Sequence, residues 1–262
     1  MRDEAGHPGD RGVTPAQVPG GGATAPEPPR VRTRSVARRA FTPALLDSLY
    51  ELANRLMAED AAHFRVHAAS NDVVHVFERA DTGAPVGFQF WRTAAMARPR
   101  QRALIGGKLR IDPAFRRRAL HLRSGLRIYA ESQLRHPRTR FYRLSLASMF
   151  GFVSITSALA SYRLFDAAAT DPDSRTVRGA FERMAADSHY ALDPATSLFA
   201  VGIRPTAQTL AQYSDAYYAR PEAQVYARAN PGWRSNGCYV GFWFRFTPAN
   251  LWKLARTIAH KR

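Results

Sequence analysis

The chain of 262 residues contains one cysteine and only three lysines. A single thiol, Cys238, excludes an internal disulfide framework and any zinc site built from several thiolates. The residues around it give no signal of an activated nucleophile. The sequence also has no Gly-x-Ser-x-Gly elbow, no complete phosphate-binding P-loop and no carboxylate cluster with metal-ligand spacing. These absences argue against a serine or cysteine hydrolase and against a metalloenzyme.

Signals for export or for a membrane span are missing as well. The N-terminus carries Asp3, Glu4 and Asp10 where a secretory signal would have a basic start and an apolar run. The uncharged stretch nearest to a membrane span, residues 144–162, holds six Ser or Thr residues and a glycine, which indicates buried protein interior and no transmembrane segment. With a single cysteine and no export signal, we expect a cytoplasmic protein.

Positive charge is abundant. Lys and Arg number 38 against 21 Asp and Glu, which gives a net charge of +17 and a pI near 11.0. A basic surface concentrates nucleic acid, anionic lipid or phosphorylated ligands. Because arginine greatly outnumbers lysine and alanine is frequent, the coding bias of a GC-rich genome explains the excess equally well. Both explanations stay open at this point. The apolar content of 45% is ample for a core.

The first part of the chain divides into a tail, a helix and a hairpin. Gly, Pro, Ala and charged residues dominate residues 1–35, which predicts a disordered N-terminal tail. Thr42 and Pro43 then open an amphipathic helix over residues 42–60. Residues 73–93 contain two β-rich runs, and the turn residues 81–85 between them predict a β-hairpin.

A strand, a helix and a strand follow as one βαβ unit. Residues 103–112 predict a strand in which Gly106 and Gly107 indicate a bulge or a close backbone approach. The chain breaks at Asp112-Pro113, a helix starts near Arg116, and residues 140–150 form the next strand. A right-handed crossover leaves the helix N-terminus beside the carboxyl end of the first strand, where ligands of α/β proteins usually bind.

The start of that helix is crowded with cations. Arg116, Arg117 and Arg118 would sit at the positive end of the helix dipole, where they add repulsion unless an anion is held against the exposed backbone N–H groups. The sequence therefore predicts an anion site at the N-terminus of this helix.

The remainder is less regular. Helical spacing occurs in residues 157–168 and 175–190, strand character in 196–205 and 237–246, and Thr247-Pro248 opens a final basic helix. The aromatic segment 207–233 gives no clear assignment. The final helix places leucines opposite basic residues, so it packs on its own domain or lies on a membrane surface.

The succession of helix, hairpin, strand ending in "RIDPAFRRRALHL", long helix and strand resembles the GNAT acyltransferase superfamily over about residues 40–167. The resemblance implies an α/β fold with a mixed sheet, here with a GNAT-like domain over 36–205 and a C-terminal extension over 206–262 packed on it. It also implies an acyltransferase that moves an acyl group from a thioester to a small amine or hydroxyl acceptor. The donor would be acyl-CoA or an acyl carrier protein, an acidic partner that suits a basic surface.

In that family, backbone N–H groups of an Arg/Gln-x-x-Gly-x-Gly/Ala loop grip the pyrophosphate of acyl-CoA. The corresponding residues are Arg116, Arg117, Arg118, Ala119, Leu120 and His121. Ala119 and His121 replace the small residues, so the loop is degenerate, and a histidine fits only if its ring turns away from the phosphates. Either the pyrophosphate is displaced and held partly by arginine side chains, or the scaffold binds another ligand.

The resemblance implies an acid for the leaving thiolate at Tyr162, and His75 is a weaker candidate base. Each has a purely structural alternative, Tyr162 as a core residue and His75 as a satisfied histidine. No metal is expected. The competing class is a nucleic-acid-binding or non-catalytic scaffold protein with a basic surface, because residues 92–143 hold fifteen Lys or Arg against two acids. No nucleic-acid-binding motif accompanies them, and nucleic acid is therefore not the favoured partner.

Overall fold

The computed structural model describes residues 29–261. The strands are β1 Val31–Ala37, β2 Met57–Ala58, β3 Val73–Arg79, β4 Pro85–Ala95, β5 Gln101–Ile111, β6 Arg140–Ala147, β7 Arg163–Leu164, β8 Ala191–Asp193, β9 Leu198–Ala200, β10 Arg204–Pro205 and β11 Cys238–Arg245. The α-helices are α1 Pro43–Leu56, α2 Ala61–Ala69, α3 Leu120–Arg135, α4 Met149–Thr156, α5 Pro172–Asp187, α6 Ala207–Ala211, α7 Asp215–Tyr218, α8 Pro221–Ala229 and α9 Pro248–Ala259.

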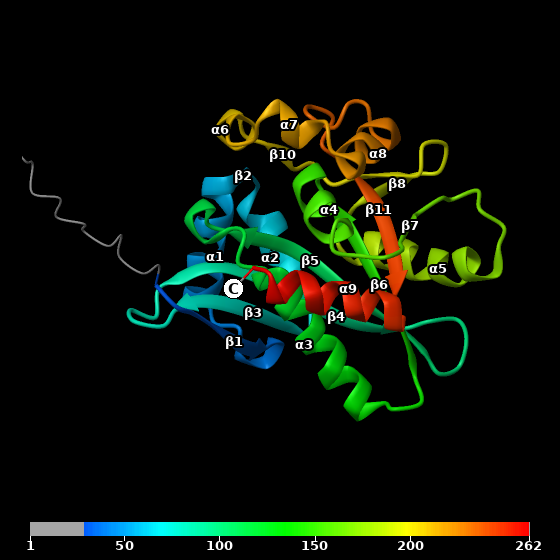
Figure 1. The fold of residues 1–262 in the computed structure, drawn as a ribbon, viewed down its shortest axis with the longest axis horizontal. Helices are drawn as coiled ribbons and strands as arrows, with labels where there is room; N and C mark the ends of the chain where they lie inside the picture. The colour runs from blue at the N-terminus through cyan, green and yellow to red at the C-terminus, as the bar shows by residue number, and fades with distance from the viewer. Residues whose placement is uncertain (1–28, 262) are drawn as a thin grey trace, which may run out of the picture.

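Nearly all of the strands form one mixed sheet in the order β1-β3-β4-β5-β6-β11-β9-β8, with β7 paired to β11 (Figure 1). β5 and β6 are parallel and α3 connects them, whereas the other neighbours in this sheet are antiparallel. The predicted hairpin is confirmed in β3 and β4, and the predicted βαβ unit in β5, α3 and β6. The mixed α/β fold expected from the sequence is therefore confirmed.

Helices cover both faces of the sheet. Aromatic and aliphatic residues of α1 and α2, such as Leu49 and Phe64, pack with Phe88 and Phe90 on one face. On the other face α3 packs over Trp91 and Leu104. In Figure 1, α3 and α9 cross in front of the sheet, and α4 lies beside the region where β5 and β6 meet. This region becomes the centre of the candidate site.

Two of the predicted helices begin as the sequence indicated. The Thr42 hydroxyl accepts the Leu45 N–H at 3.2 Å and Pro43 opens α1. Thr247 caps α9 in the same way through Asn250 N–H at 3.3 Å. Leu254 of α9 is buried in the domain, so this helix packs on its own fold.

The start of α3 corrects a prediction. The helix begins at Leu120, and Arg116, Arg117 and Arg118 lie in the loop before it. The Asp112 carboxylate accepts the Ala114 N–H at 2.9 Å and supports a short 3-10 turn at Pro113–Phe115. Arg117 and Ala119 then adopt the left-handed region, at φ 71° and 53°, which interrupts a continuous helix. The arginines therefore surround the helix N-terminus from the loop.

Other segments differ from the sequence interpretation too. Residues 157–168, expected to be helical, contain only the short strand β7, while the uncharged stretch before them forms α4. β1 begins at Val31, inside the predicted tail, and pairs with β3; residues 1–28 lie outside the described residues. The unassigned segment 207–233 forms the short helices α6, α7 and α8. Within residues 29–261, no helix combines the length and the apolar character that crossing a membrane requires.

Candidate functional site

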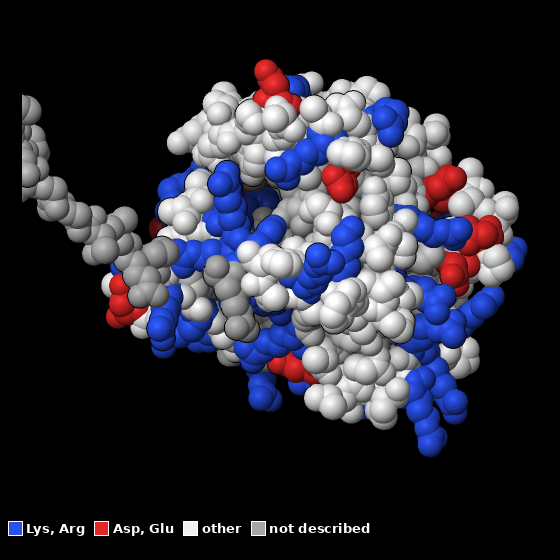
Figure 2. Space-filling view, viewed as in Figure 1, with Lys and Arg blue, Asp and Glu red and all other residues white. Residues whose placement is uncertain are grey.

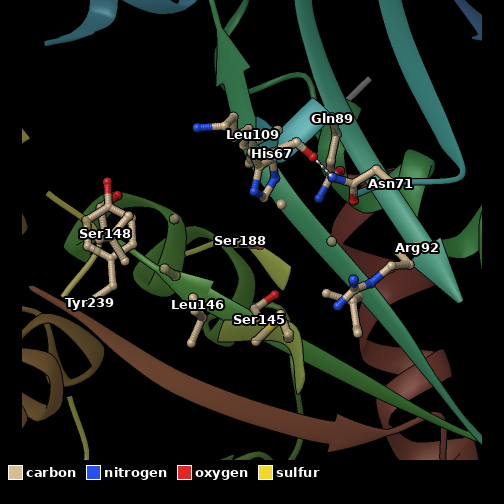
Figure 3. Close-up of a pocket in the computed structure, with 18 of the residues that line it drawn as sticks. His67, Asn71, Gln89, Arg92, Leu109, Ser145, Leu146, Ser148, Ser188 and Tyr239 are labelled. Carbon is tan, nitrogen blue, oxygen red and sulfur yellow. Dashed lines mark hydrogen bonds between the residues drawn. The ribbon is translucent and has the colours of Figure 1, made fainter. Parts of the chain in front are cut away.

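A cavity opens where β5 and β6 separate. Their parallel pairing ends at Ile105 and Leu144, and beyond this point β5 is paired to β4 alone. The cavity has a volume of about 80 Å³, which is room for several water molecules or a small organic group. Its wall contains β5 residues 105–110, β6 residues 143 and 145–147 and residues of α4 (Figure 3). Residues of α2, β4, α5 and β11 and of the segments 188–190 and 201–203 also line it.

The Gly106-Gly107 pair lets two side chains approach the backbone of β5. A Cβ added to Gly106 would lie 2.2 Å from Nη2 of Arg143. A Cβ added to Gly107 would lie 2.5 Å from Nε2 of His67. Side chains at these positions would collide with Arg143 and His67, so the close approach expected from this pair is confirmed.

A β-bulge follows the glycines. Phe88 pairs with Arg110 and Phe90 with Gly107, so one residue of β4 opposes two of β5, Lys108 and Leu109. Lys108 adopts φ 41°. The extra residue of a bulge is left out of the ladder, and both residues line the cavity. Backbone N–H groups released in this way are donors that can stabilise a developing oxyanion.

Several polar side-chain atoms at the cavity have no hydrogen-bond partner within the described part of the chain. Among them are His67 Nε2, Gln89 Oε1, Arg110 Nε and Tyr239 Oη. A buried polar group without a partner costs free energy, so a concentration of such groups in one cavity indicates a place for water or ligand. In Figure 3, His67 and Tyr239 come from different walls of the cavity.

Burial decides the protonation of these groups. Desolvation, with the nearby His63, lowers the pKa of His67 to about 3, so the ring is neutral. Desolvation raises the pKa of Tyr239 despite the opposing effects of Arg110 and the Ser148 side chain, so its phenol stays protonated. The cavity wall thus holds a neutral histidine ring, whose Nδ1 lies 3.4 Å from the Tyr190 hydroxyl, and the protonated phenol of Tyr239.

A buried charge cluster forms part of the same wall. The Lys108 ammonium contacts the Glu59 carboxylate, and Arg110 Nη2 lies 3.4 Å from the other oxygen of Glu59. Burial and the neighbouring Arg110 lower the pKa of Lys108 to about 6, whereas contact with a carboxylate favours the ammonium. Lys108 also lies over the Phe64 ring, 5.6 Å from its centroid.

The six predicted loop residues lie together at the end of β5, outside the cavity. Arg116 Nη1 donates to Gln212 Oε1 at 2.5 Å and to the Tyr213 hydroxyl at 3.2 Å. Arg118 Nη1 donates to the Pro29 carbonyl at 2.6 Å, and Arg117 is exposed. Ala119 and Leu120 are buried, and no side chain caps the first turn of α3. The N–H groups of this turn are therefore without a side-chain acceptor.

His121 points away from the loop and into the protein. Its Nε2 lies 3.0 Å from the Ser154 hydroxyl of α4, and the residue is only 8% exposed. Burial lowers the pKa of His121 to about 4, with Lys261 and Arg143 as further contributors. The ring therefore turns away from the loop, as a histidine at this position must do if the loop is to bind phosphates.

Neither predicted catalytic side chain lines the cavity. Tyr162 is packed edge-on against Phe152, with ring centroids 5.5 Å apart. His75 is fully buried on the α3 side of the sheet, where its Nδ1 lies 2.7 Å from the Ser124 hydroxyl. Their catalytic roles stay predictions, and the cavity itself offers His67 and Tyr239 instead.

Sequence reasoning overlooked α2 and the His67 that it carries. A signal was present, because His63 and His67 are four residues apart and share one helix face. Within residues 29–261, no group of three or more potential metal ligands accompanies them. The His63 ring instead lies 3.4 Å from the Ser188 carbonyl.

Positive charge is spread over the face that carries α3 and α9 (Figure 2). Around the start of α3, Arg116 lies over the Tyr213 ring and Arg220 over the Tyr217 ring, at 5.8 Å and 5.1 Å from the centroids. Burial lowers the pKa of Lys261, and the neighbouring Arg220 lowers it further. These cations form no ion pair with a carboxylate of the described residues.

No protein-family model matches the sequence, and a search of curated proteins gives no match. Among solved structures, the chain is similar to the NatC complex bound to Gag peptide and CoA, at 8% identity over 53% of this chain and 90% of the other, with a TM-score of 0.38. It is also similar to a GNAT-family N-acetyltransferase from Escherichia coli in complex with CoA, at 15% identity over 51% of this chain and 69% of the other, with a TM-score of 0.35.

A third similar structure is glucosamine-6-phosphate N-acetyltransferase from Arabidopsis thaliana, at 12% identity over 49% of this chain and 89% of the other, with a TM-score of 0.36. Likeness at these levels says nothing about substrate or activity. The architecture of this chain itself has the succession that the sequence resemblance implied, from the first helix through the hairpin to the parallel β5-α3-β6 unit. The chain has a GNAT-like fold.

Proposed function

We propose that this protein is an acyltransferase that moves an acyl group from acyl-CoA to a small amine or hydroxyl acceptor. The observation that carries the proposal is the cavity at the separation of β5 and β6, with a bulged strand on its wall and an uncapped, arginine-surrounded helix N-terminus at the end of the same strand.

The start of α3 is suited to the phosphates of the donor. Backbone N–H groups of the first turn have no side-chain acceptor, and the helix dipole favours an anion there. Arg117 is exposed, and Arg116 and Arg118 flank the turn. Since the His121 ring is directed against α4, it does not project from the loop. In this assignment the six loop residues bind the pyrophosphate.

The cavity is suited to the reacting groups. The acceptor nitrogen or oxygen attacks the thioester carbonyl carbon, the carbon–sulfur bond breaks, and the acceptor loses a proton while the thiolate gains one. In the tautomer that carries its proton on Nδ1, beside the Tyr190 hydroxyl, the neutral His67 ring accepts a hydrogen bond from the substrate amine or hydroxyl through Nε2. The proton passes to water because the pKa of His67 is too low for the ring to retain one. Tyr239 donates a proton to the thiolate and recovers it from water, and N–H groups of the bulge stabilise the oxyanion.

Thermal unfolding with CoA, acetyl-CoA and a random oligonucleotide, each at two salt concentrations, tests the donor site. Saturable binding stabilises the protein by about 2.7 kcal/mol at a hundredfold excess over the dissociation constant. We expect this stabilisation with CoA and with acetyl-CoA. We expect it to be lost when Arg116, Arg117 and Arg118 are replaced together by Ala.

Arg175→Ala on α5 is the matched control, because Arg175 is exposed and distant in sequence from the loop. It should bind CoA as the unmodified protein does. Stabilisation by the oligonucleotide alone, lost at higher salt, would contradict the proposal and favour nucleic-acid binding.

A further inference from the structure

The wall of the cavity carries more positive than negative charge. Lys108, Arg110 and Arg143 line it, and each is at most 9% exposed. Within residues 29–261, Glu59 is the carboxylate that pairs with Lys108 and Arg110, and Arg143 forms no ion pair. A positive excess therefore remains whether Lys108 is charged or neutral.

Of these three cations, Arg143 is the one that has no counter-ion among the described residues. Its guanidinium lies 4.4 Å from the centre of the Trp91 ring and donates through Nη1 to the carbonyls of Leu104 and Leu144. Burial lowers the pKa of Arg143 to about 9, which still leaves it charged at neutral pH. Both hydrogen bonds within the described residues come from Nη1, and Nε and Nη2 have no protein acceptor among those residues.

The local backbone is shaped around this guanidinium. A Cβ at Gly106 would lie 2.2 to 2.7 Å from three guanidinium atoms. Only a glycine at this point of β5 lets the charged group rest against the strand at the cavity. The two carbonyls and the Trp91 ring compensate the buried charge only in part, and an anion at this place would lower the remaining cost of burying it.

We propose that the cavity binds a carboxylate group of the substrate, with the Nε–Nη2 edge of Arg143 as its main partner and Lys108 and Arg110 completing the positive wall. A carboxylate matches the planar guanidinium fork in shape and charge. The assignment rests on the proposed acyl transfer for the identity of the molecule, because the carboxylate belongs either to a dicarboxylic acyl group or to an amino-acid-like acceptor.

Butyrate and butyramide test the charge preference in the unmodified protein. The two probes differ only in replacing a carboxylate with a neutral amide, and sodium chloride equalises the ionic strength. We expect calorimetric titration to give at least tenfold tighter binding of butyrate, since hydrogen bonds between charged groups are the stronger ones. Equal affinities, or no binding of butyrate, would overturn the proposal without any variant.

Substitutions then locate the preference. Arg143→Gln should abolish the preference for butyrate over butyramide. Arg143→Lys should retain part of this preference because the positive charge is kept. Arg175→Gln, an exposed arginine on α5, should leave it unchanged. If Arg143→Gln does not fold, Gly106→Ala displaces the guanidinium and should weaken butyrate binding; retention of the full preference in the folded variant would contradict the role of Arg143.

Two substrate pairs distinguish the source of the carboxylate. Succinyl-CoA should react at least tenfold faster than butyryl-CoA, measured as kcat/KM, if the acyl group carries it. Alanine should exceed alaninamide by the same factor if the acceptor does. Selective butyrate binding without turnover of any pair would support the anion cavity and count against acyl transfer, whereas turnover with no charge preference in either pair would overturn the carboxylate assignment alone.

Discussion

At the scale of residues, Tyr162 and Tyr239 are the two candidates for the acid, and their surroundings in the fold differ. Tyr162 is half-buried among aromatic rings, and burial raises its pKa. Tyr239 lines the cavity, where its hydroxyl has no hydrogen-bond partner among the described residues. A buried hydroxyl without a protein partner can donate to a leaving group that enters the cavity, whereas Tyr162 does not line the cavity.

Tyr239→Phe and Tyr162→Phe form a matched pair, because each removes one hydroxyl. We expect Tyr239→Phe to lower kcat by roughly 10²–10⁴-fold with little change in KM, as the loss of a proton donor does. Tyr162→Phe should change kcat less than threefold. Steady-state kinetics with an acyl-CoA checks both, and the opposite ranking would return the acid role to Tyr162.

At the scale of elements, β5 is the strand that makes the site. Its first half pairs with both β4 and β6, and its second half leaves β6 and bulges at Lys108. Gly107 lies between these halves, with the His67 ring resting on it. The strand therefore fixes the position of a side chain that belongs to α2.

Gly107→Ala should displace His67, because the new Cβ would lie 2.5 Å from Nε2. We expect the substitution to destabilise the fold by about 1–3 kcal/mol, as overpacking does, and to reduce activity further than the stability loss explains. Gly179→Ala in α5 is the control: its Cβ meets only the Arg183 side chain at 3.4 Å, and alanine favours a helix by about 1 kcal/mol. Chemical unfolding measures both, and full activity in folded Gly107→Ala would remove His67 from the mechanism.

At the scale of the whole molecule, the interior holds several histidines that burial keeps neutral. The pKa of His67 is lowered to about 3, and those of His75 and His121 to about 4, in each case mainly by desolvation. An unfolded histidine has a pKa of about 6.5. Between these values the unfolded chain binds more protons than the folded one, so the free energy of unfolding falls as the pH falls from 6.5 towards 4.

His121→Gln should flatten this dependence by up to about 1.4 kcal/mol per pH unit. The measurement is the free energy of unfolding in urea between pH 4 and 7, compared with the unmodified protein. An unaltered slope in His121→Gln would show that His121 is protonated equally in both states.

The sequence by itself determined the local elements. Thr42-Pro43 and Thr247-Pro248 specify helix starts through side-chain caps and a fixed φ, and alternating apolar residues specify the β3-β4 hairpin; these signals act between near neighbours and can be read directly. The Gly106-Gly107 pair predicted a close approach to the backbone of the strand, and Arg116, Arg117 and Arg118 predicted a concentration of positive charge before the helix. None of these signals names the partner on the other side of the contact.

Only the tertiary structure decided what meets at the cavity. His67 from α2, Arg143 from β6 and Tyr239 from β11 come together because β5 and β6 part after Ile105 and Leu144, and that separation depends on packing across both faces of the sheet. The uncompensated charge of Arg143 and the low pKa of His67 likewise follow from burial, which depends on residues far away in the chain. Desolvation and long-range contacts have no local sequence pattern, so the sequence could not show that His67 and Tyr239 line one cavity; the catalytic roles of Tyr162 and His75 stay predictions.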